Sequence, residues 1–355
     1  MKKRTVKIGN LNIGGSSPVR IESMLKVPLS DLRACKEQID QLWASGCELV
    51  RVAFPDISLV DALRQLTTYS PIPLMADIHF NFRLALAAIE SGCPSIRLNP
   101  GNMGTSSELD NVVDLAKQNR VVIRIGANSG SLSRDILESS NGDAAKALVI
   151  AVEKQLELLL ERDFQDIILS SKSTRLSDCL RSNYLLAQKY GDFPFHIGIT
   201  ESGPGIRGVV KSSCGLAFLL FQGIGDTLRV SLTDTPVSEV KTGFEILRTL
   251  GIRDHGPEII SCPTCGRKRA DIQAIIKEFL PLIEELPDGF KFAVMGCEVN
   301  GPGEAKAADL GIAGTAGGLV IFRNGEVIAD GQTDEMKTML KKIIHSIHND
   351  QKMGQ

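Results

Sequence analysis

Three cysteines and a glutamate in the C-terminal part of the chain have types and spacing suited to holding a metal. Cys262 and Cys265 form a C-x-x-C pair in SCPTCGR, and Cys297 lies in MGCEVNGPGE, where Glu304 follows seven residues later. Such a pair is typical of a zinc knuckle, a redox dithiol or part of an iron–sulfur site. A dithiol leaves Cys297 without a role, and a zinc site requires a fourth Cys or His that is not well placed after Cys297. Three thiolates and a carboxylate suit a cubane cluster with one distinctive iron.

Cations lie within, or at the end of, runs that otherwise look like buried strands. An unpaired cation there costs several kcal/mol, because a barrel strand faces a packed interior or a layer of helices. Any one cation could pair with Asp77, Glu201 or Asp226, but pairing of the whole set is not expected, so we infer an anionic ligand such as a diphosphate. Guanidinium groups suit phosphate because their donors form a planar fork. These cations are Arg51, Arg97, Arg124, Lys172 and Arg229.

Small and titratable polar groups follow the same strands. The loops RLNPGN, RIGANSG and TESGPGIRG place glycines where backbone N–H groups can bind an anion at a helix N-terminus. Glu201 is the best acid/base candidate, because burial would raise its pKa toward the working pH. His79 and His196 belong either to a polar site or to the core with satisfied hydrogen bonds. The other candidates at strand ends are Asp77, Asn99, Asn128 and Thr200.

The elements that position these residues recur along the first 235 residues, where short β-branched runs alternate with longer stretches of helical spacing. The runs are PVRIESM, LVRVAF, PLMADIHF, SIRLNPGN, VVIRIGAN, DIILSSKS, FHIGITESG and TLRVSLTD. Eight such pairs in succession predict a TIM-type (β/α)8 barrel over residues 1–252, with an open doubly wound sheet as the alternative. In such a barrel the carboxyl ends of the strands converge on one face, which would form the substrate site.

A small α/β domain is predicted over residues 258–355, after a linker at IRDHGPE. Its expected strands are EIISC, KFAVMGC and the hairpin GLVIFRNGEVIAD, which turns at Asn324 and Gly325. Its expected helices are RADIQAIIKEFLPLIEEL and MKTMLKKIIHSIHN. This domain contains the cysteine pair and Cys297, so it is the predicted metal-binding domain.

Composition narrows the function classes. The chain has 355 residues, 43% of them hydrophobic, which is enough for a sizeable core. Its 40 Lys and Arg nearly balance its 42 Asp and Glu, so no net positive field favours nucleic acid or an anionic membrane. The basic N-terminus turns polar at once, without the apolar stretch of a secretory signal, and we expect a cytoplasmic protein with mostly reduced thiols.

The two cysteine segments, SCPTCGR and MGCEVNGPGEAKAADLGIAG, resemble the signature of the 4-hydroxy-3-methylbut-2-en-1-yl diphosphate synthase family of the non-mevalonate isoprenoid pathway. Ordered matches continue in VRVAFP, ADIHF, IRLNPGN, RIGANSGSL, SSKS, HIGITESG, VKSS and GIGDTLRVSLT. The resemblance implies a TIM-type barrel joined to an iron–sulfur domain, in the two-domain form that lacks the insertion of plant-type members. It also implies a 4Fe-4S cluster whose ligands are Cys262, Cys265, Cys297 and Glu304.

The reaction that this resemblance implies is the reductive ring opening of 2-C-methyl-D-erythritol 2,4-cyclodiphosphate. Two electrons enter, a hydroxyl leaves as water, and (E)-4-hydroxy-3-methylbut-2-enyl diphosphate is formed. The resemblance further implies flavodoxin or ferredoxin as the electron donor. It also implies a homodimer in which the cluster domain of one subunit covers the barrel mouth of the other.

Roles follow for the candidate residues, as hypotheses. Glu201 would supply a proton near the departing hydroxyl, and the residues expected to orient it are His79, Asp77 and Thr200. Arg267 and Asn300, beside the cluster ligands, would reach the substrate. The other expected substrate-binding residues are Arg51, Arg97, Asn99, Arg124, Asn128, Lys172, His196, Lys211, Ser212, Arg229 and Ser231.

Two alternative functions remain open from the residues alone. The first is a phosphosugar aldolase or lyase, with Lys172 as a Schiff-base amine and a structural zinc knuckle in the second domain. The second is a non-catalytic metal-binding module that senses iron or redox state. Iron and sulfide content would separate these alternatives from the synthase.

Overall fold

The structure is a computed structural model that describes residues 3–79, 81–99, 105–297 and 305–353. The chain divides into two compact units, Met1–Arg253 and Asp254–Gln355. Each unit has a hydrophobic core of its own. Asn300 and Glu304, two of the predicted site residues, lie outside the described residues.

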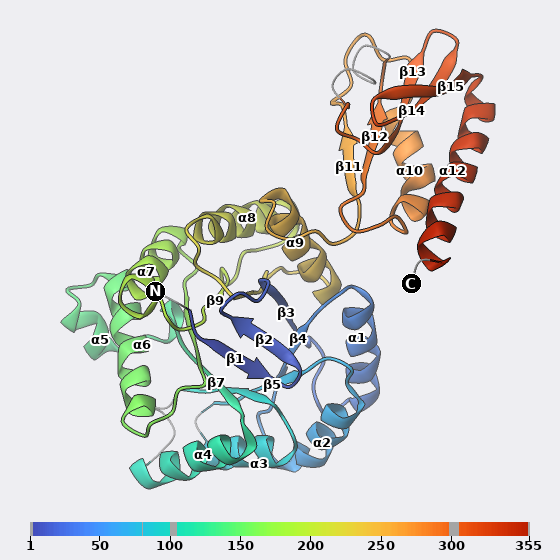
Figure 1. The fold of residues 1–355 in the computed structure, drawn as a ribbon. Helices are drawn as coiled ribbons and strands as arrows, with labels where there is room; N and C mark the ends of the chain where they lie inside the picture. Colours follow the sequence, from blue (N-terminus) through green and yellow to red (C-terminus); the bar gives the residue numbers. More distant parts are fainter. Residues whose placement is uncertain (1–2, 80, 100–104, 298–304, 354–355) are drawn as a thin grey trace. The chain divides into compact units, whose positions relative to one another are not determined.

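Eight parallel strands form the barrel of the first unit (Figure 1). They are β3 (Arg20–Met24), β4 (Leu49–Ala53), β5 (Leu74–Asp77), β6 (Ser95–Arg97), β7 (Val122–Asn128), β8 (Ile167–Lys172), β9 (His196–Ile197) and β10 (Thr227–Leu228). Their order is β8-β7-β6-β5-β4-β3-β10-β9, and the ring closes where Leu169 of β8 bridges Phe195 next to β9. The predicted TIM-type barrel is therefore confirmed, and the open doubly wound sheet is wrong.

A helix follows each barrel strand and packs on the outside of the ring (Figure 1). The helices are α1 (Leu32–Ala44), α2 (Val60–Tyr69), α3 (Phe82–Glu90), α4 (Ser106–Asn119), α6 (Ala144–Leu160), α7 (Leu176–Tyr190), α8 (Gly205–Phe221) and α9 (Pro236–Thr249). Shorter helical segments in the connections are η1 (Ile57–Leu59), η3 (Ser129–Ser131) and α5 (Arg134–Ser139). Polar caps start several of these helices: Asp31 accepts a hydrogen bond from the Ala34 amide, and Thr105 forms a capping box with Glu108.

An antiparallel hairpin that the sequence analysis did not predict precedes the barrel. It consists of β1 (Thr5–Ile8) and β2 (Leu11–Gly14). Its inward side chains pack against residues at the amino ends of barrel strands, which include Leu49 and Val122. The hairpin therefore closes the amino end of the barrel, and the carboxyl ends of the strands remain as the mouth.

The second unit is built on a five-stranded mixed sheet with order β11-β12-β13-β14-β15. Its strands are β11 (Glu258–Ser261), β12 (Lys291–Met295), β13 (Leu310–Thr315), β14 (Gly318–Arg323) and β15 (Glu326–Gly331). The helices α10 (Ile272–Ile283) and α12 (Thr333–Met353) pack on one face of this sheet around Phe292 and Ile312. A smaller cluster around Phe322 and Ala305 covers the other face.

The predicted strands and helices of this unit are present, and one strand was missed. β14 and β15 turn at Asn324 and Gly325, whose φ angles of 50° and 81° suit the tight hairpin turn expected there. The missed strand is β13, whose sequence LGIAGT contains two glycines. Along the described parts of the chain, no helix has both the length and the apolar character needed to span a bilayer.

Candidate active site

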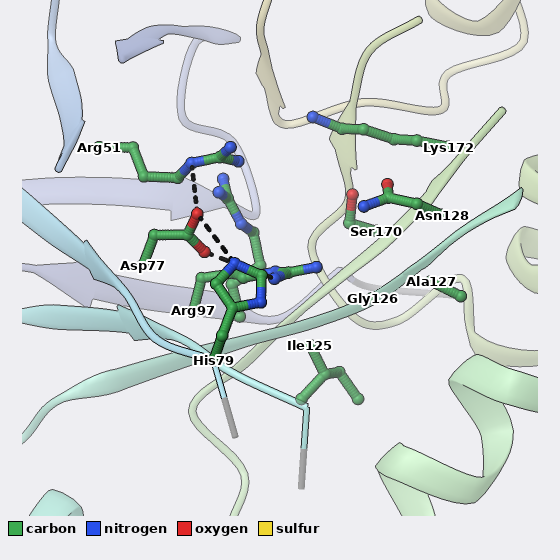
Figure 2. Close-up of a pocket in the computed structure, with 11 residues that line it drawn as sticks. Arg51, Asp77, His79, Arg97, Ile125, Gly126, Ala127, Asn128, Ser170 and Lys172 are labelled. Atoms are coloured by element: carbon green, nitrogen blue, oxygen red, sulfur yellow. Dashed lines mark hydrogen bonds and ion pairs between the residues drawn. The ribbon is translucent and has the colours of Figure 1, made fainter. Parts of the chain in front are cut away.

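A cavity of about 230 Å³ lies at the carboxyl ends of the barrel strands (Figure 2). Parallel pairing brings its charged residues together, because Asp77, Arg97 and Arg124 are register partners on β5, β6 and β7. Asn128 and Lys172 are likewise register partners at the ends of β7 and β8. The residues of the sequence prediction that line the cavity are Arg51, Asp77, His79, Arg97, Arg124, Asn128 and Lys172.

Asp77 organises one wall of this cavity. Its carboxylate lies 3.6 Å from Arg51 Nε, 3.4 Å from Arg97 Nη1 and 3.6 Å from His79 Nε2. Burial alone would raise the pKa of Asp77, but the hydrogen bond with His79 and the charges of Arg51 and Arg97 hold that pKa well below its usual range. Asp77 is therefore an anion that orients its neighbours, as Figure 2 shows, and it cannot act as a proton donor near neutral pH.

Glu22 in β3 is a second buried acid, which the sequence analysis missed. It pairs with Arg124, and both side chains are almost fully buried. Within the described residues, the second Nη of Arg124 and Oε1 of Glu22 have no hydrogen-bond partner. Since Arg124 also lines the cavity, its remaining donor is suited to a ligand oxygen. The sequence does contain a signal for Glu22. This charged residue interrupts the apolar strand run RIESM, just as the cations interrupt the other predicted strands.

Lys172 and His196 form a buried pair of basic side chains. Lys172 Nζ lies 2.8 Å from His196 Nε2, and His196 Nδ1 lies 2.8 Å from the Thr227 hydroxyl. Burial first, and then the positive charges of Arg124 and Arg51, hold the pKa of Lys172 well below its usual value. Burial and the neighbouring cations, Lys172 first among them, lower the pKa of His196 as well. His196 is thus the satisfied core histidine that the sequence analysis left open, and it supports Lys172 from behind the cavity wall.

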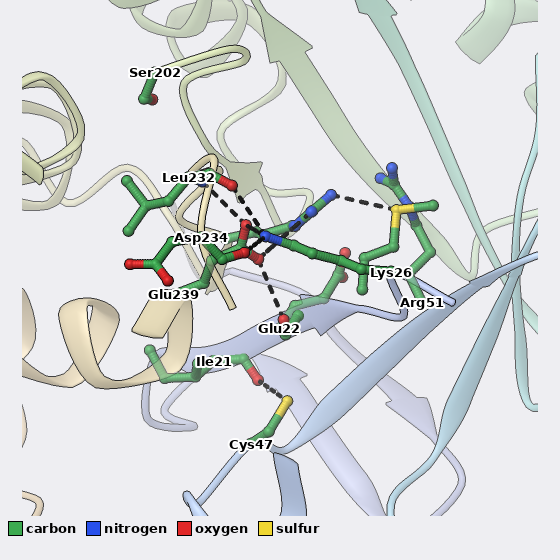
Figure 3. Close-up of polar contacts among 12 residues, drawn as sticks. Ile21, Glu22, Lys26, Cys47, Arg51, Ser202, Leu232, Asp234 and Glu239 are labelled. Atoms are coloured by element: carbon green, nitrogen blue, oxygen red, sulfur yellow. Dashed lines mark hydrogen bonds and ion pairs between the residues drawn. The ribbon is translucent and has the colours of Figure 1, made fainter. Parts of the chain in front are cut away.

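Glu239 in α9 is a third buried acid that the sequence analysis missed (Figure 3). Its carboxylate lies 3.4 Å from Arg229 Nε and 2.9 Å from Lys26 Nζ, and it accepts a hydrogen bond from the Leu232 amide at 3.0 Å. Lys26 also donates to the Leu232 carbonyl at 2.9 Å and to the carbonyl of Asp234. This cluster ties the loop after β10 to the end of β3.

The expectation that the barrel cations would not all find internal acids is met by Lys172, which contacts His196, but not by the four arginines. Each of the arginines pairs with Asp77, Glu22 or Glu239, while Asp226 instead pairs with Lys3. The charges still do not balance, because three carboxylates serve five cations and leave an excess of two positive charges in this network. These cations are Lys26, Arg51, Arg97, Arg124 and Arg229. The excess, rather than unpaired single groups, favours an anionic ligand.

The environment of Glu201 differs from the one predicted for it. Glu201 is exposed, so the expected burial is wrong, and its backbone has the left-handed φ of 53° in the turn that follows Thr200. Non-glycine residues adopt this conformation where the surrounding structure imposes it, often at functional sites. The Glu201 carbonyl accepts a hydrogen bond from Lys211 Nζ at 3.4 Å, which places Lys211 beside the same turn.

The remaining barrel candidates lie in two other places. Ser212 is buried on α8 and donates to the Ser202 hydroxyl at 2.9 Å, and the Ser231 carbonyl accepts from the Ser202 amide. These serines hold the loops after β9 and β10 together. Asn99 lines a neighbouring cavity of about 600 Å³, which shares Asn128 with the first cavity.

In the second unit, the three cysteines line one cavity of about 190 Å³ together with Arg267 and Gly296. The Gly296 amide donates to Cys262 Sγ at 3.2 Å. Hydrogen bonds from the backbone and side chain of Arg267 lower the pKa of the exposed Cys265 thiol. Within the described ranges, no group of three or more His, Cys, Asp or Glu residues is arranged to hold a metal ion.

Comparisons with known proteins agree with this architecture. The model of the GcpE TIM-barrel domain matches residues 3–244, and that of the GcpE protein C-terminal domain matches residues 258–346. The chain belongs to the GcpE family. Two similar relatives are both named 4-hydroxy-3-methylbut-2-en-1-yl diphosphate synthase (flavodoxin). The protein of Maridesulfovibrio salexigens is 47% identical over 94% of this chain and 93% of its own length, and that of Nitratidesulfovibrio vulgaris is 48% identical over 92% and 84%.

Among solved structures, N-acetylneuraminic acid synthetase from Leptospira borgpetersenii serovar Hardjo-bovis is similar with a TM-score of 0.50. The alignment covers 78% of this chain and 97% of that chain, at 14% sequence identity. At this identity the likeness concerns the fold alone. The match of both family models, by contrast, confirms the resemblance that the cysteine segments indicated.

Proposed function

We propose that this member of the GcpE family is a 4-hydroxy-3-methylbut-2-en-1-yl diphosphate synthase that reductively opens 2-C-methyl-D-erythritol 2,4-cyclodiphosphate. Nearly full-length identity to relatives with this name supports the proposal. The observation that carries it is the combination, in one chain, of a barrel mouth with excess positive charge and a cavity lined by three cysteines. The aldolase alternative lacks this support, because the family match concerns the synthase.

The barrel, residues 1–252, binds the substrate in this proposal. Arg51, Arg97 and Arg124 present forked donors to the diphosphate from β4, β6 and β7. Lys172 faces the same cavity with a pKa lowered by burial and by the neighbouring cations, and a diphosphate between it and Arg124 would favour its protonation. Asn99, Asn128, Arg229 and Ser231 complete the proposed substrate-binding set, with His196, Lys211 and Ser212 supporting it through their contacts.

The second domain, residues 258–355, holds a 4Fe-4S cluster in this proposal. The donor set fits such a group, because thiolates are the usual ligands of these clusters and all three cysteines line one cavity. Glu304 is the proposed fourth ligand, a harder and more readily displaced donor than a thiolate. When bound, the cluster supplies the two electrons of the reaction. Arg267, which lines the same cavity, and Asn300 are proposed to contact the substrate.

Proton delivery is proposed for Glu201, because the cations around Asp77 hold that carboxyl as an anion. The exposed turn at Glu201 leaves its carboxylate accessible to a ligand above the barrel mouth. His79, Asp77 and Thr200 orient the substrate beside it. We expect Glu201→Gln to keep iron content and substrate binding and to lower kcat by about a hundredfold or more. Glu90→Gln, an exposed change on α3, is the matched control. Unchanged turnover in Glu201→Gln would remove Glu201 from the mechanism.

The proposed electron donor is flavodoxin, which the names of both relatives contain, and ferredoxin is the second candidate. Turnover with each reduced donor in parallel, at equal concentration, identifies the better one. The proposed subcellular location is the cytoplasm, where both donors occur.

A homodimer is the proposed assembly, with the cluster domain of one subunit over the barrel mouth of the other. The outer face of α8 offers an apolar stripe for a second copy, because exposed apolar residues recur every three or four positions. They are Ile206, Val210, Cys214, Phe218 and Phe221. Phe221 is 82% exposed, which is unusual for so large an apolar side chain. We expect Phe221→Glu to give monomers in analytical ultracentrifugation, whereas an unchanged mass would contradict this use of α8.

The decisive experiment purifies the protein without oxygen and measures iron, sulfide and turnover together. We expect a brown protein with about four iron and four sulfide per chain, which converts the cyclic diphosphate when reduced flavodoxin is present. A colourless protein with about one zinc per chain and no turnover would favour the aldolase alternative. Bleaching by dithionite without recovery on adding the cyclic diphosphate would favour the metal sensor.

A further inference from the structure

Met24, the last residue of β3, places its sulfur between two guanidinium groups of the barrel mouth. Arg51 Nε lies 3.2 Å from Met24 Sδ, and Arg229 Nη1 lies 3.3 Å from the same atom. Both distances are shorter than those from these arginines to their carboxylate partners, 3.6 Å to Asp77 and 3.4 Å to Glu239. The thioether is therefore the nearest acceptor that the two groups share.

The barrel topology explains why one residue reaches both arginines. β3 lies between β4 and β10, and Met24 is the register partner of Arg51 on β4. Arg229 directly follows β10 on the other side of β3. Side chains alternate along a strand, so Met24 and Glu22 point to the same side, toward the barrel interior. The sequence thus places an acid in the deeper layer and a neutral side chain at the mouth.

The chemistry of sulfur suits this position. A carboxylate at residue 24 would add a fourth acid and halve the positive excess of the network. An alkyl side chain would leave two charged donors facing an apolar surface, which costs free energy. A thioether accepts weak hydrogen bonds from both arginines and carries no charge. Phosphate oxygens form stronger, charge-assisted bonds, so an arriving anion can replace the sulfur as acceptor.

We propose that Met24 is a positioning residue for the substrate site. Its sulfur holds Arg51 and Arg229 apart and pre-oriented without neutralising them, and it gives up both hydrogen bonds when the diphosphate of the substrate binds. This inference rests on the proposed function, since it assigns the anion that the two arginines receive.

Three substitutions separate the hydrogen-bonding role of Met24 from packing. Met24→Leu keeps the volume and removes the acceptor, so we expect KM for the cyclic diphosphate to rise by about fivefold to thirtyfold, with a much smaller change in kcat. Met24→Gln restores a neutral acceptor and should return KM to within about threefold of the wild-type value. Met24→Glu adds a charge and should raise KM more than Met24→Leu does.

Met75→Leu is the matched control, because Met75 is a buried methionine of β5 that packs in the cluster at the closed end of the barrel. Met75 is the register partner of Arg51, but within the described residues its sulfur accepts no hydrogen bond from an arginine and its side chain packs among apolar residues. We therefore expect a shift in Tm without a change in KM. If Met24→Leu and Met75→Leu have the same KM, the proposal is overturned. If Met24→Leu does not fold, the comparison of Met24→Gln with Met24→Glu still decides, since equal KM values for these two would contradict it.

A binding measurement keeps this test independent of the proposed reaction. Calorimetric titration of each purified variant with inorganic pyrophosphate should give the order wild type, Met24→Gln, Met24→Leu, Met24→Glu from tightest to weakest. This order, together with a wild-type protein that does not convert the cyclic diphosphate, would overturn the proposed function and leave the role of Met24 standing. Equal pyrophosphate affinities among the variants would overturn the role of Met24.

Discussion

The barrel mouth and the cysteine cavity place their reactive side chains on different kinds of structure. At the mouth, Arg97, Arg124 and Lys172 lie on strands, and buried carboxylates hold the arginines. In the second unit, Cys262 and Cys265 lie in the loop after β11, and Cys265 is exposed. The hydrogen bond from Gly296 to Cys262 is a backbone contact to a sulfur atom, in contrast to the ion pairs of the mouth.

This difference indicates what holds each site in shape. The barrel mouth is pre-assembled, since its charges are fixed by parallel register and by buried pairs that also contribute to folding. The cysteine cavity relies on loops, and a bound cluster would itself order the loops that supply its ligands. Changes at the mouth should therefore alter stability and binding together, whereas changes at the cysteines should alter the metal and leave the barrel folded.

The largest effect is expected for Cys265→Ser, which removes a proposed cluster ligand from an exposed position. Iron content should fall, and turnover should decrease by about a thousandfold or more, because electrons no longer reach the substrate. The unfolding transition of the barrel should not change. Glu90→Gln, an exposed change on the barrel, is the control and should keep iron and activity. Full iron content in Cys265→Ser would remove this residue from the ligand set.

Thiol alkylation should separate the exposed Cys265 from the buried cysteines of the barrel next most strongly. Burial raises the pKa of Cys47 to about 12 and that of Cys93 to about 11. At pH 8 the thiolate fraction of Cys47 is then about a thousandfold below that of a free cysteine, and reagent cannot reach it. After treatment with an iron chelator, mass spectrometry should find iodoacetamide on Cys265 and not on Cys47. Early labelling of Cys47 would show that the barrel opens.

Breaking the buried pair beneath the mouth should have a smaller but clear effect on stability. Glu22→Leu leaves Arg124 buried without its acid, and we expect a loss of about 3–5 kcal/mol in the free energy of unfolding. The double change Glu22→Leu with Arg124→Leu should recover much of this loss. Glu37→Leu breaks the exposed pair with Arg33 and should cost less than about 1 kcal/mol. Urea unfolding followed by circular dichroism measures the free energy of unfolding of all three variants. Equal losses of this free energy in Glu22→Leu and Glu37→Leu would mean that burial of the ion pair does not matter.

The smallest effect is expected for the pH dependence of diphosphate binding. The pKa of Lys172 is held well below its usual value in the free protein, and a bound diphosphate would raise it again. Between these two pKa values, binding takes up a proton, so affinity should fall as pH rises, by at most about tenfold per pH unit. Titration with inorganic pyrophosphate in buffers of different ionisation enthalpy measures this uptake. Lys172→Gln should abolish the share of this proton uptake that is due to Lys172. An unchanged proton uptake in that variant would assign the proton to another group.

Much of the barrel could be predicted from the sequence, because its signals are local. Each strand run is β-branched and bounded by turns, and the order of strands and helices implies the closed ring. Parallel register then pairs Arg97 with Arg124 and Lys172 with Asn128. The C-x-x-C pair and Cys297 were equally visible, and the structure places all three around one cavity.

The acids that accompany these cations could not be assigned in the same way. Glu239 lies on a helix and reaches Arg229 and Lys26 because α9 packs against β3. Asp226, which looked equally suitable, pairs with Lys3 from the N-terminal segment instead. Glu201 was expected to be buried, but the turn after Thr200 leaves it exposed. These outcomes depend on long-range packing, which periodicity does not encode.

The sequence by itself therefore determined the fold class, the family and the types of reactive groups, since those follow from local pattern and from motifs that persist along the chain. Only the tertiary structure decided how the charges are shared: that Glu22 and Glu239 complete the mouth, that Lys172 is buried beside His196, and that Met24 lies between Arg51 and Arg229. The physical reason is that charge pairing and desolvation depend on distance and burial, and the closed ring brings together residues far apart in the chain.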